Sequence, residues 1–288
     1  MNKDLVRAGG LLVILGLVVV FSLGCIGPQE GTDEQKTVTL RITGSTTALP
    51  FVAQAAEEFN ALGKDVQVSV SGGGSGAGIK DLGEGRSSIA MISREVTGDE
   101  KKSYDTAGKK LTEIMIGYDA IILAVSPEVY DGGIKAVTRE QVKAIYAGNI
   151  TNWKEIGGSD KEIYVIGRKA GSGTRDTFNE LVMGNKGAET PGVQTEAEGN
   201  AEVKTAIVGS DTAIGYVGIS YVGNDVRALK LDGVDASVET IKTENYELAR
   251  KLYLVTLGEP SPQQKEFLGF VTGAEGQIIA EENGFVPL

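Results

Sequence analysis

Three glycine-rich segments place hydroxyl groups where an apolar strand pattern gives way to a helical one. They are residues 42–50 (ITGSTTALP), 70–80 (VSGGGSGAGIK) and 167–178 (GRKAGSGTRDTF). The N-terminus of a helix carries partial positive charge and unpaired N–H groups, so it can bind an anion. An ordinary helix cap explains any one segment equally well. Three such segments in one chain indicate a shared oxyanion site.

Two arginines could supply the charge for this site. Arg168 lies four residues before Ser172, and Arg94 directly follows the apolar segment 88–93 (SIAMIS). A guanidinium group can chelate two oxygens of an oxyanion through parallel N–H bonds. The alternative for each arginine is a surface charge or an ion pair with one of the many acidic residues.

Recognisable catalytic machinery is missing from the sequence. The chain contains no histidine and a single cysteine, Cys25, so the usual general base and the common zinc ligands are absent. The Gly-Lys pairs at 63–64 and 108–109 lack the following Ser or Thr of a phosphate-binding loop. Ala77 stands where a nucleophile elbow at Ser75 needs glycine. We therefore expect a binding protein without a metal or cofactor, rather than an enzyme.

The charge balance restricts the partners. The chain has 28 basic and 39 acidic residues and a formal net charge of -11. Nucleic-acid binding requires a basic face, so we expect no nucleic-acid partner. An anion site in such a chain has to be built locally, because the overall field does not attract anions.

The N-terminal segment has the pattern of an export signal. Lys3 and Arg7 precede an uncharged apolar run from Leu11 to Leu23, which is shorter than a bilayer-spanning helix. The following SLGC resembles a bacterial lipobox with Cys25 as the lipidated residue. We predict a lipoprotein signal peptide over 1–25 and a flexible tether over 26–37. An uncleaved signal anchor with an idle cysteine is the alternative.

Strand and helix patterns alternate through the rest of the chain, which predicts an α/β fold with mostly parallel sheets. The length suits two lobes. In such sheets ligands bind beyond the carboxyl ends of the strands, where the glycine-rich segments lie. We also expect Thr138 and Asn200 to be N-caps of helices. The expected strands are 38–42, 66–70, 88–93, 119–125, 163–166, 213–217 and 251–257.

From about residue 38 onward the sequence resembles the phosphate-binding proteins of ABC-type phosphate uptake systems. The segments that carry the resemblance are ITGSTTALP, GGGSGAGIKDL, IAMISRE, IYAGNITNWKEIGG, GRKAGSGTRDTF and TAIGYVGISYV. The resemblance implies a two-lobed periplasmic-binding-protein fold that closes on its ligand about a hinge. We expect the first lobe over 38–118 and 224–288 and the second over 119–223.

The resemblance also implies which residues contact phosphate. Thr46 and Thr47 come from the first segment and Ser75 from the second. From the third segment come Arg168, Ser172, Gly173 and Thr174.

Two departures from the family pattern concern the phosphate proton. Long-form members carry an acidic proton acceptor where this chain has Arg94, although short-form members share the Ser93–Arg94 pair. Members also often carry an acid where this chain has Ala170. Phosphate bears a proton near neutral pH and sulfate does not, so a carboxylate acceptor selects phosphate. Asp119 is our candidate acceptor, since it opens a strand that reads as buried; a cap near the hinge is equally consistent with it.

We therefore expect a lipid-anchored, extracytoplasmic, monomeric protein that captures inorganic phosphate and delivers it to ABC permease subunits. Other possible ligands are sulfate, arsenate and molybdate. A phosphate-ester hydrolase and a purely adhesive surface lipoprotein are the alternatives from other classes.

Overall fold

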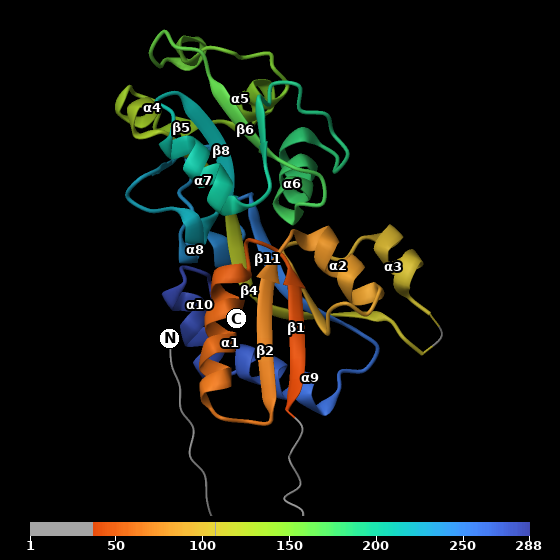
Figure 1. Ribbon diagram of the computed structural model, residues 1–288. Helices are drawn as coiled ribbons and strands as arrows, with labels where there is room; N and C mark the ends of the chain where they lie inside the picture. The colour runs from red at the N-terminus through yellow and green to blue at the C-terminus, as the bar shows by residue number, and fades with distance from the viewer. Residues whose placement is uncertain (1–36, 107) are drawn as a thin grey trace, which may run out of the picture. The chain divides into compact units, whose positions relative to one another are not determined.

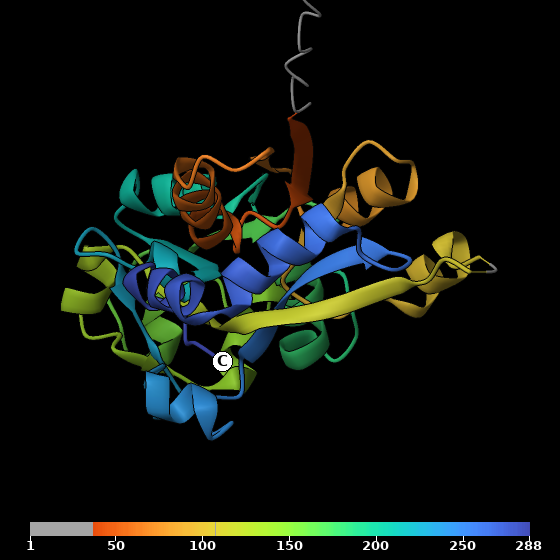
Figure 2. The same ribbon diagram turned by 90° about the horizontal axis from the view of Figure 1, so that it is seen from below.

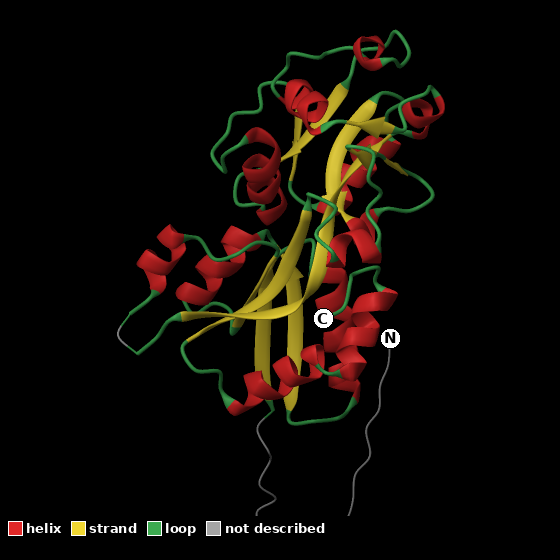
Figure 3. Cartoon of the chain, turned by 180° about the vertical axis from the view of Figure 1, so that it is seen from behind, coloured by secondary structure: helices red, strands yellow, loops and turns green. Residues whose placement is uncertain are grey.

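A computed structural model describes residues 37–106 and 108–288 (Figure 1). These residues contain a nine-stranded sheet, ordered β2-β1-β3-β11-β4-β8-β6-β7 with β9 beside β4, and a two-stranded sheet of β10 and β5. Helices flank the strands on both sides (Figure 3). The predicted signal peptide, Cys25 and all but the last residue of the tether lie outside the described residues. None of the described helices has the length and apolar character needed to cross a bilayer.

The first lobe is built on three parallel strands. Strand β1 (Val38–Gly44) pairs in parallel with β2 (Val66–Gly72) and with β3 (Ile89–Ile92). Its helices are α1 (Leu49–Ala61), α2 (Ser75–Gly83), α3 (Gly98–Tyr104), α9 (Pro262–Thr272) and α10 (Ala274–Glu282). Helices α9 and α10 lie beside α1 (Figure 2). They cover a core in which Phe59 of α1 meets the ring of Phe267 edge-on.

The second lobe has its own parallel strands. Strand β6 (Tyr164–Arg168) lies between β7 (Thr195–Ala197) and β8 (Ala213–Gly218), parallel to both. The rings of Phe178 and Tyr216 stack in its core, with centroids 4.2 Å apart. Its helices are α4 (Pro127–Asp131), α5 (Arg139–Tyr146), α6 (Gly173–Phe178) and α7 (Asn200–Val208), with single-turn elements at Trp153–Ile156, Asn179–Met183 and Ile219–Tyr221. Thr138 forms the predicted capping box at the start of α5.

Two long strands join the lobes and run antiparallel. Strand β4 (Leu111–Val125) pairs with β11 (Ala249–Leu257) along one part and with β8 along the other. Strand β11 also pairs antiparallel with β3. The sheet as a whole is therefore mixed: the strands within each lobe are parallel, as expected, and the antiparallel pairs all involve β4 or β11. The physical reason is that the chain crosses between the lobes once in each direction, so the two crossing strands run opposite ways.

The segment after β8 stays with the second lobe. It contains β9 (Arg227–Ala228), β10 (Lys230–Leu231), the short sheet partner β5 (Ala136–Val137) and α8 (Val238–Lys242). Leu231, Ile241 and Leu248 pack into the same core cluster as Trp153 and Tyr216. We therefore propose that the return to the first lobe begins at β11, rather than at residue 224 as the sequence led us to expect.

Candidate anion-binding site

The three glycine-rich segments meet between the lobes. The hydroxyl oxygens of Thr47, before α1, and Thr174, in α6, lie 3.0 Å apart. The N–H of Gly76 in α2 donates to the carbonyl of Gly171, before α6, over 3.1 Å. The structure thus brings the third segment together with the first two, at the carboxyl ends of β1, β2 and β6, as the sequence predicted.

Close packing of small residues closes this junction. A Cβ added to Gly173 would lie 2.3 Å from the Ser75 hydroxyl oxygen and 2.8 Å from that of Ser93. The Ser75 hydroxyl also accepts a hydrogen bond from the N–H of Ser93 at 3.2 Å. Ser172 is the N-cap of α6 and accepts from the N–H of Arg175. The side chains of Ser75 and Ser172 therefore have structural roles at the point where the segments meet.

Arg168 is a buried cation at the end of β6. Its side chain is almost wholly enclosed, with 1 % of the residue exposed. Its Nη2 donates to the Thr46 hydroxyl at 3.2 Å and to the carbonyl of Glu198 at 2.9 Å. Its Nε and Nη1 have no hydrogen-bond partner among the described residues. Burial, with a contribution from the charge of Arg250, lowers its pKa to about 10, so the group is still charged at neutral pH.

Asn200 connects the two threonines of the first segment. Its Nδ2 donates to the hydroxyl of Thr46 at 3.1 Å and to that of Thr47 at 3.0 Å. The expectation that Asn200 caps a helix is wrong, because Gly199 is the N-cap of α7 and Asn200 is its first residue. The side chain turns to the threonines because helical backbone begins one residue earlier than expected. The only sequence signals for this role of Asn200 were its polar side chain and its position at the predicted start of a helix.

Arg250 and Asp119 form a buried ion pair beside Thr47. Arg250 Nε and Nη2 lie 2.7 and 2.6 Å from Asp119 Oδ2, and Nη2 also donates to the Thr47 hydroxyl at 3.0 Å. Burial raises the pKa of Asp119 and lowers that of Arg250, while their mutual attraction opposes both changes. Asp119 is therefore the counter-ion of a second arginine. Sequence reasoning missed Arg250, although an arginine in the strand-like run ARKLYLVTL was a usable signal.

Arg94 lies apart from these groups and is already satisfied. Its Nε donates to Asp176 at 2.7 Å, and Nη1 and Nη2 donate to the two oxygens of Glu100 at 2.9 and 2.8 Å. Nη1 also donates to the carbonyl of Glu95. Arg94 therefore forms ion pairs with acidic residues, which was the alternative to an anion-binding role. Because Asp176 belongs to α6, the arginine ties the first lobe to the second.

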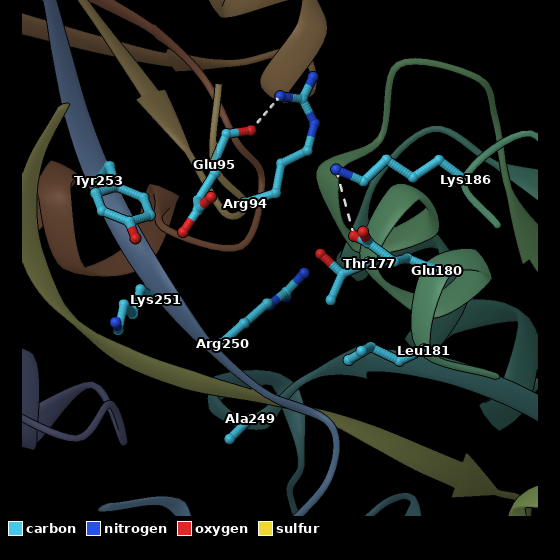
Figure 4. A pocket seen from close by; sticks show the side chains of 10 residues that line it. All are labelled: Arg94, Glu95, Thr177, Glu180, Leu181, Lys186, Ala249, Arg250, Lys251 and Tyr253. Atoms are coloured by element: carbon cyan, nitrogen blue, oxygen red, sulfur yellow. Dashed lines mark hydrogen bonds and ion pairs between the residues drawn. The ribbon is translucent and has the colours of Figure 1, made fainter. Parts of the chain in front are cut away.

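Two pockets flank the buried groups. One, of about 290 Å³, is lined by Arg94 and Tyr253 on one side, Thr177 and Lys186 on the other, and Arg250 between them (Figure 4). The other, of about 310 Å³, is lined among others by Thr46, Asn200 and Tyr221. The cluster of Thr46, Thr47, Arg168, Asn200 and Arg250 thus borders both pockets, the first through Arg250 and the second through Thr46 and Asn200.

Comparison with known proteins places the chain in a family. The model of the PBP superfamily domain matches residues 30–275. The phosphate-binding protein PstS of Bacillus subtilis is 34 % identical over 89 % of this chain and 83 % of its own length. The chain belongs to the PstS family. The PstS protein of Borreliella burgdorferi is 29 % identical over 96 % of this chain and 98 % of its own.

Solved PstS-like structures agree with the two-lobed fold. A phosphate ABC transporter substrate-binding protein from Clostridium perfringens, crystallised with bound phosphate, has a TM-score of 0.78 at 36 % identity and covers 87 % of this chain and 99 % of its own. An ABC-type phosphate transport receptor from Vibrio cholerae has a TM-score of 0.70 at 30 % identity, over 86 % of this chain and 100 % of its own. The family and fold predicted from the sequence are confirmed.

Proposed function

We propose that this PstS-family chain captures inorganic phosphate between its two lobes and delivers it to ABC permease subunits. The observation that carries the proposal is the Arg168 guanidinium group, which is buried, charged and without a carboxylate partner among the described residues. A buried charge is costly unless it is paired and hydrogen-bonded. An oxyanion at its free Nε and Nη1 would supply both the opposite charge and the missing acceptors.

The hydroxyl groups around Arg168 complete the proposed site. The Thr47 and Thr174 hydroxyls lie 3.0 Å apart, and the Thr46 hydroxyl accepts from Arg168 at 3.2 Å. Ser75, Ser172 and Gly173 shape the wall where α2 and α6 meet. We assign Arg94 to holding the lobes together rather than to the anion. Asp119 holds Arg250 in place, so its carboxylate is not free to accept the phosphate proton.

The cellular setting of the proposal rests on the sequence and the family. We propose an extracytoplasmic monomer anchored through a lipidated Cys25. Catalysis is not part of the proposal, because the chain has no histidine that could activate the Ser75 or Ser172 hydroxyl.

Another tetrahedral oxyanion is the second candidate. The carboxylate of Asp119 is paired with Arg250. Sulfate needs no acceptor for a proton, so it competes best where no free carboxylate is present.

Calorimetric titration with phosphate and with sulfate tests the proposal. Arg168→Ala should lower the affinity for phosphate about 100-fold or more, since removing one partner of a buried charge interaction costs about 2–5 kcal/mol. Arg139→Ala is the matched control, because Arg139 pairs with Glu247 at an exposed position. Equal phosphate affinity in wild type and Arg168→Ala would contradict the site, and tighter binding of sulfate than of phosphate would favour the second candidate.

A further inference from the structure

Asn200 is wholly buried and has an orientation fixed at both ends of its amide. Its Oδ1 accepts a hydrogen bond from the N–H of Gly218 at 3.0 Å. Its two Nδ2 hydrogens are divided between the Thr46 and Thr47 hydroxyl oxygens. A rotated amide would place its NH₂ group against the N–H of Gly218 and lose all three bonds. The amide therefore acts on both threonines only as a donor.

The hydrogen-bond capacity of a hydroxyl group then fixes where the threonine protons point. A hydroxyl oxygen accepts two hydrogen bonds and donates one. Thr46 accepts from Arg168 and Asn200, and Thr47 accepts from Asn200 and Arg250. With both acceptor positions taken, each hydroxyl can form a further bond only by donating its proton.

The Thr47 hydroxyl donates its hydrogen bond to another residue of the site. Its partner is the Thr174 hydroxyl at 3.0 Å, and since Thr47 must donate, Thr174 accepts. The Thr174 proton then remains for a ligand, as do the Thr46 proton and the free N–H groups of Arg168 Nε and Nη1. Each of these groups can donate to a ligand, and Thr46, whose two acceptor positions are both taken, can only donate.

We propose that Asn200 is the positioning residue that turns Thr46 and Thr47 into obligatory donors, Thr46 towards the ligand and Thr47 towards Thr174, so that the site favours oxyanion oxygens that carry no hydrogen. The inference rests on the proposed anion site and adds its selectivity. Asn200 belongs to the second lobe and the two threonines to the first, so this orientation forms only when the lobes meet.

Asn200→Asp tests the inference, because it replaces the Nδ2 donor by a carboxylate oxygen, which is an acceptor. The new carboxylate oxygen would accept from Thr46 and Thr47, turn their protons away from the ligand and add a negative charge. We expect an affinity for phosphate about 100-fold lower than wild type at pH 8, against about tenfold lower for Asn200→Ala, which only frees the hydroxyl groups. The unliganded Asn200→Asp protein should unfold at no lower temperature, because the carboxylate supplies the negative charge that Arg168 lacks.

The pH profile separates positioning from mere structural support. Dividing the phosphate affinity of Asn200→Asp by that of the wild type at each pH removes the effect of phosphate ionisation. This ratio should rise towards 1 as the pH falls, because protonation of the new carboxylate removes the added charge next to the anion. The corresponding ratio for Asn200→Ala should stay constant. The charged and titratable groups around position 200 that could add to the profile are Arg168, Arg250, Asp119, Glu202 and Tyr221.

The control is Asn179→Asp. Asn179 is a buried asparagine of the same lobe, and it donates to the carbonyls of Lys186 and Ala188. This variant should bind phosphate as wild type does. Wild-type affinity in Asn200→Asp, or a pH-independent ratio equal to that of Asn200→Ala, would overturn the role of Asn200. Failure of the wild-type protein to bind any oxyanion would instead overturn the proposed function.

Discussion

Single residues at the junction of the lobes decide how closely they approach. Gly173 lies against the hydroxyls of Ser75 and Ser93, with no room for a methyl group. Its neighbours Ser172 and Thr174 serve as the α6 cap and as the hydroxyl partner of Thr47. Glycine is thus required here by a contact between lobes rather than by its own backbone angles.

Gly173→Ala should lower the affinity for phosphate about tenfold or more, because the added methyl group opposes closure at a typical overpacking cost of about 1–3 kcal/mol. The measurement is calorimetric titration. Gly269→Ala is the control, since a Cβ at this position of α9 meets nothing within 4 Å, and alanine stabilises a helix interior. Unchanged affinity in Gly173→Ala would show that the lobes need not approach this closely around the ligand.

At the scale of elements, an ion-pair network fastens the start of α6 to the first lobe. Arg94 follows β3, Glu100 lies in the first turn of α3, and Asp176 lies in the first turn of α6. The side chains are 6, 17 and 22 % exposed. Because the network is largely buried, its charges depend on one another, and removal of the arginine leaves two carboxylates without a partner.

Arg94→Ala should therefore lower the free energy of unfolding by about 3–5 kcal/mol. Urea denaturation of the unliganded protein measures it. Lys102→Ala removes a cation from the exposed pair with Asp99 and should leave stability unchanged within error. A loss no greater than that of Lys102→Ala would mean that the network is an ordinary surface cluster.

At the scale of the whole molecule, the proposed anion site lies within an acidic chain. The net charge of -11 repels phosphate at a distance, so affinity has to come from short-range hydrogen bonds and from a cation shielded by burial. Added salt shortens the Debye length from about 30 Å at 0.01 M to about 8 Å at 0.15 M and acts on exposed charges far more than on buried ones.

We therefore expect the dissociation constant for phosphate to change less than about threefold between 0.01 and 0.15 M of an inert salt. The association rate should rise slightly with salt, because screening weakens the repulsion between like charges. Titration calorimetry and stopped-flow measurements test the two parts. A steep loss of affinity with salt would contradict an enclosed site.

The sequence by itself determined the family, the two-lobed α/β fold and the three segments that meet between the lobes. These follow from local patterns, since apolar strands, glycine-rich turns and helix starts each lie within about a dozen residues. Arg168 was also found this way, because it lies within one of these segments, four residues before Ser172.

Only the tertiary structure decided what the other charged and polar groups do. Arg94 and Asp119 turned out to be paired with Glu100, Asp176 and Arg250, and Asn200 contacts threonines 153 and 154 residues away in the sequence. The antiparallel crossing of β4 and β11 likewise required the complete sheet. The physical reason is that the partner of a buried polar group is set by which segments the fold brings within about 3 Å, and no local pattern records that.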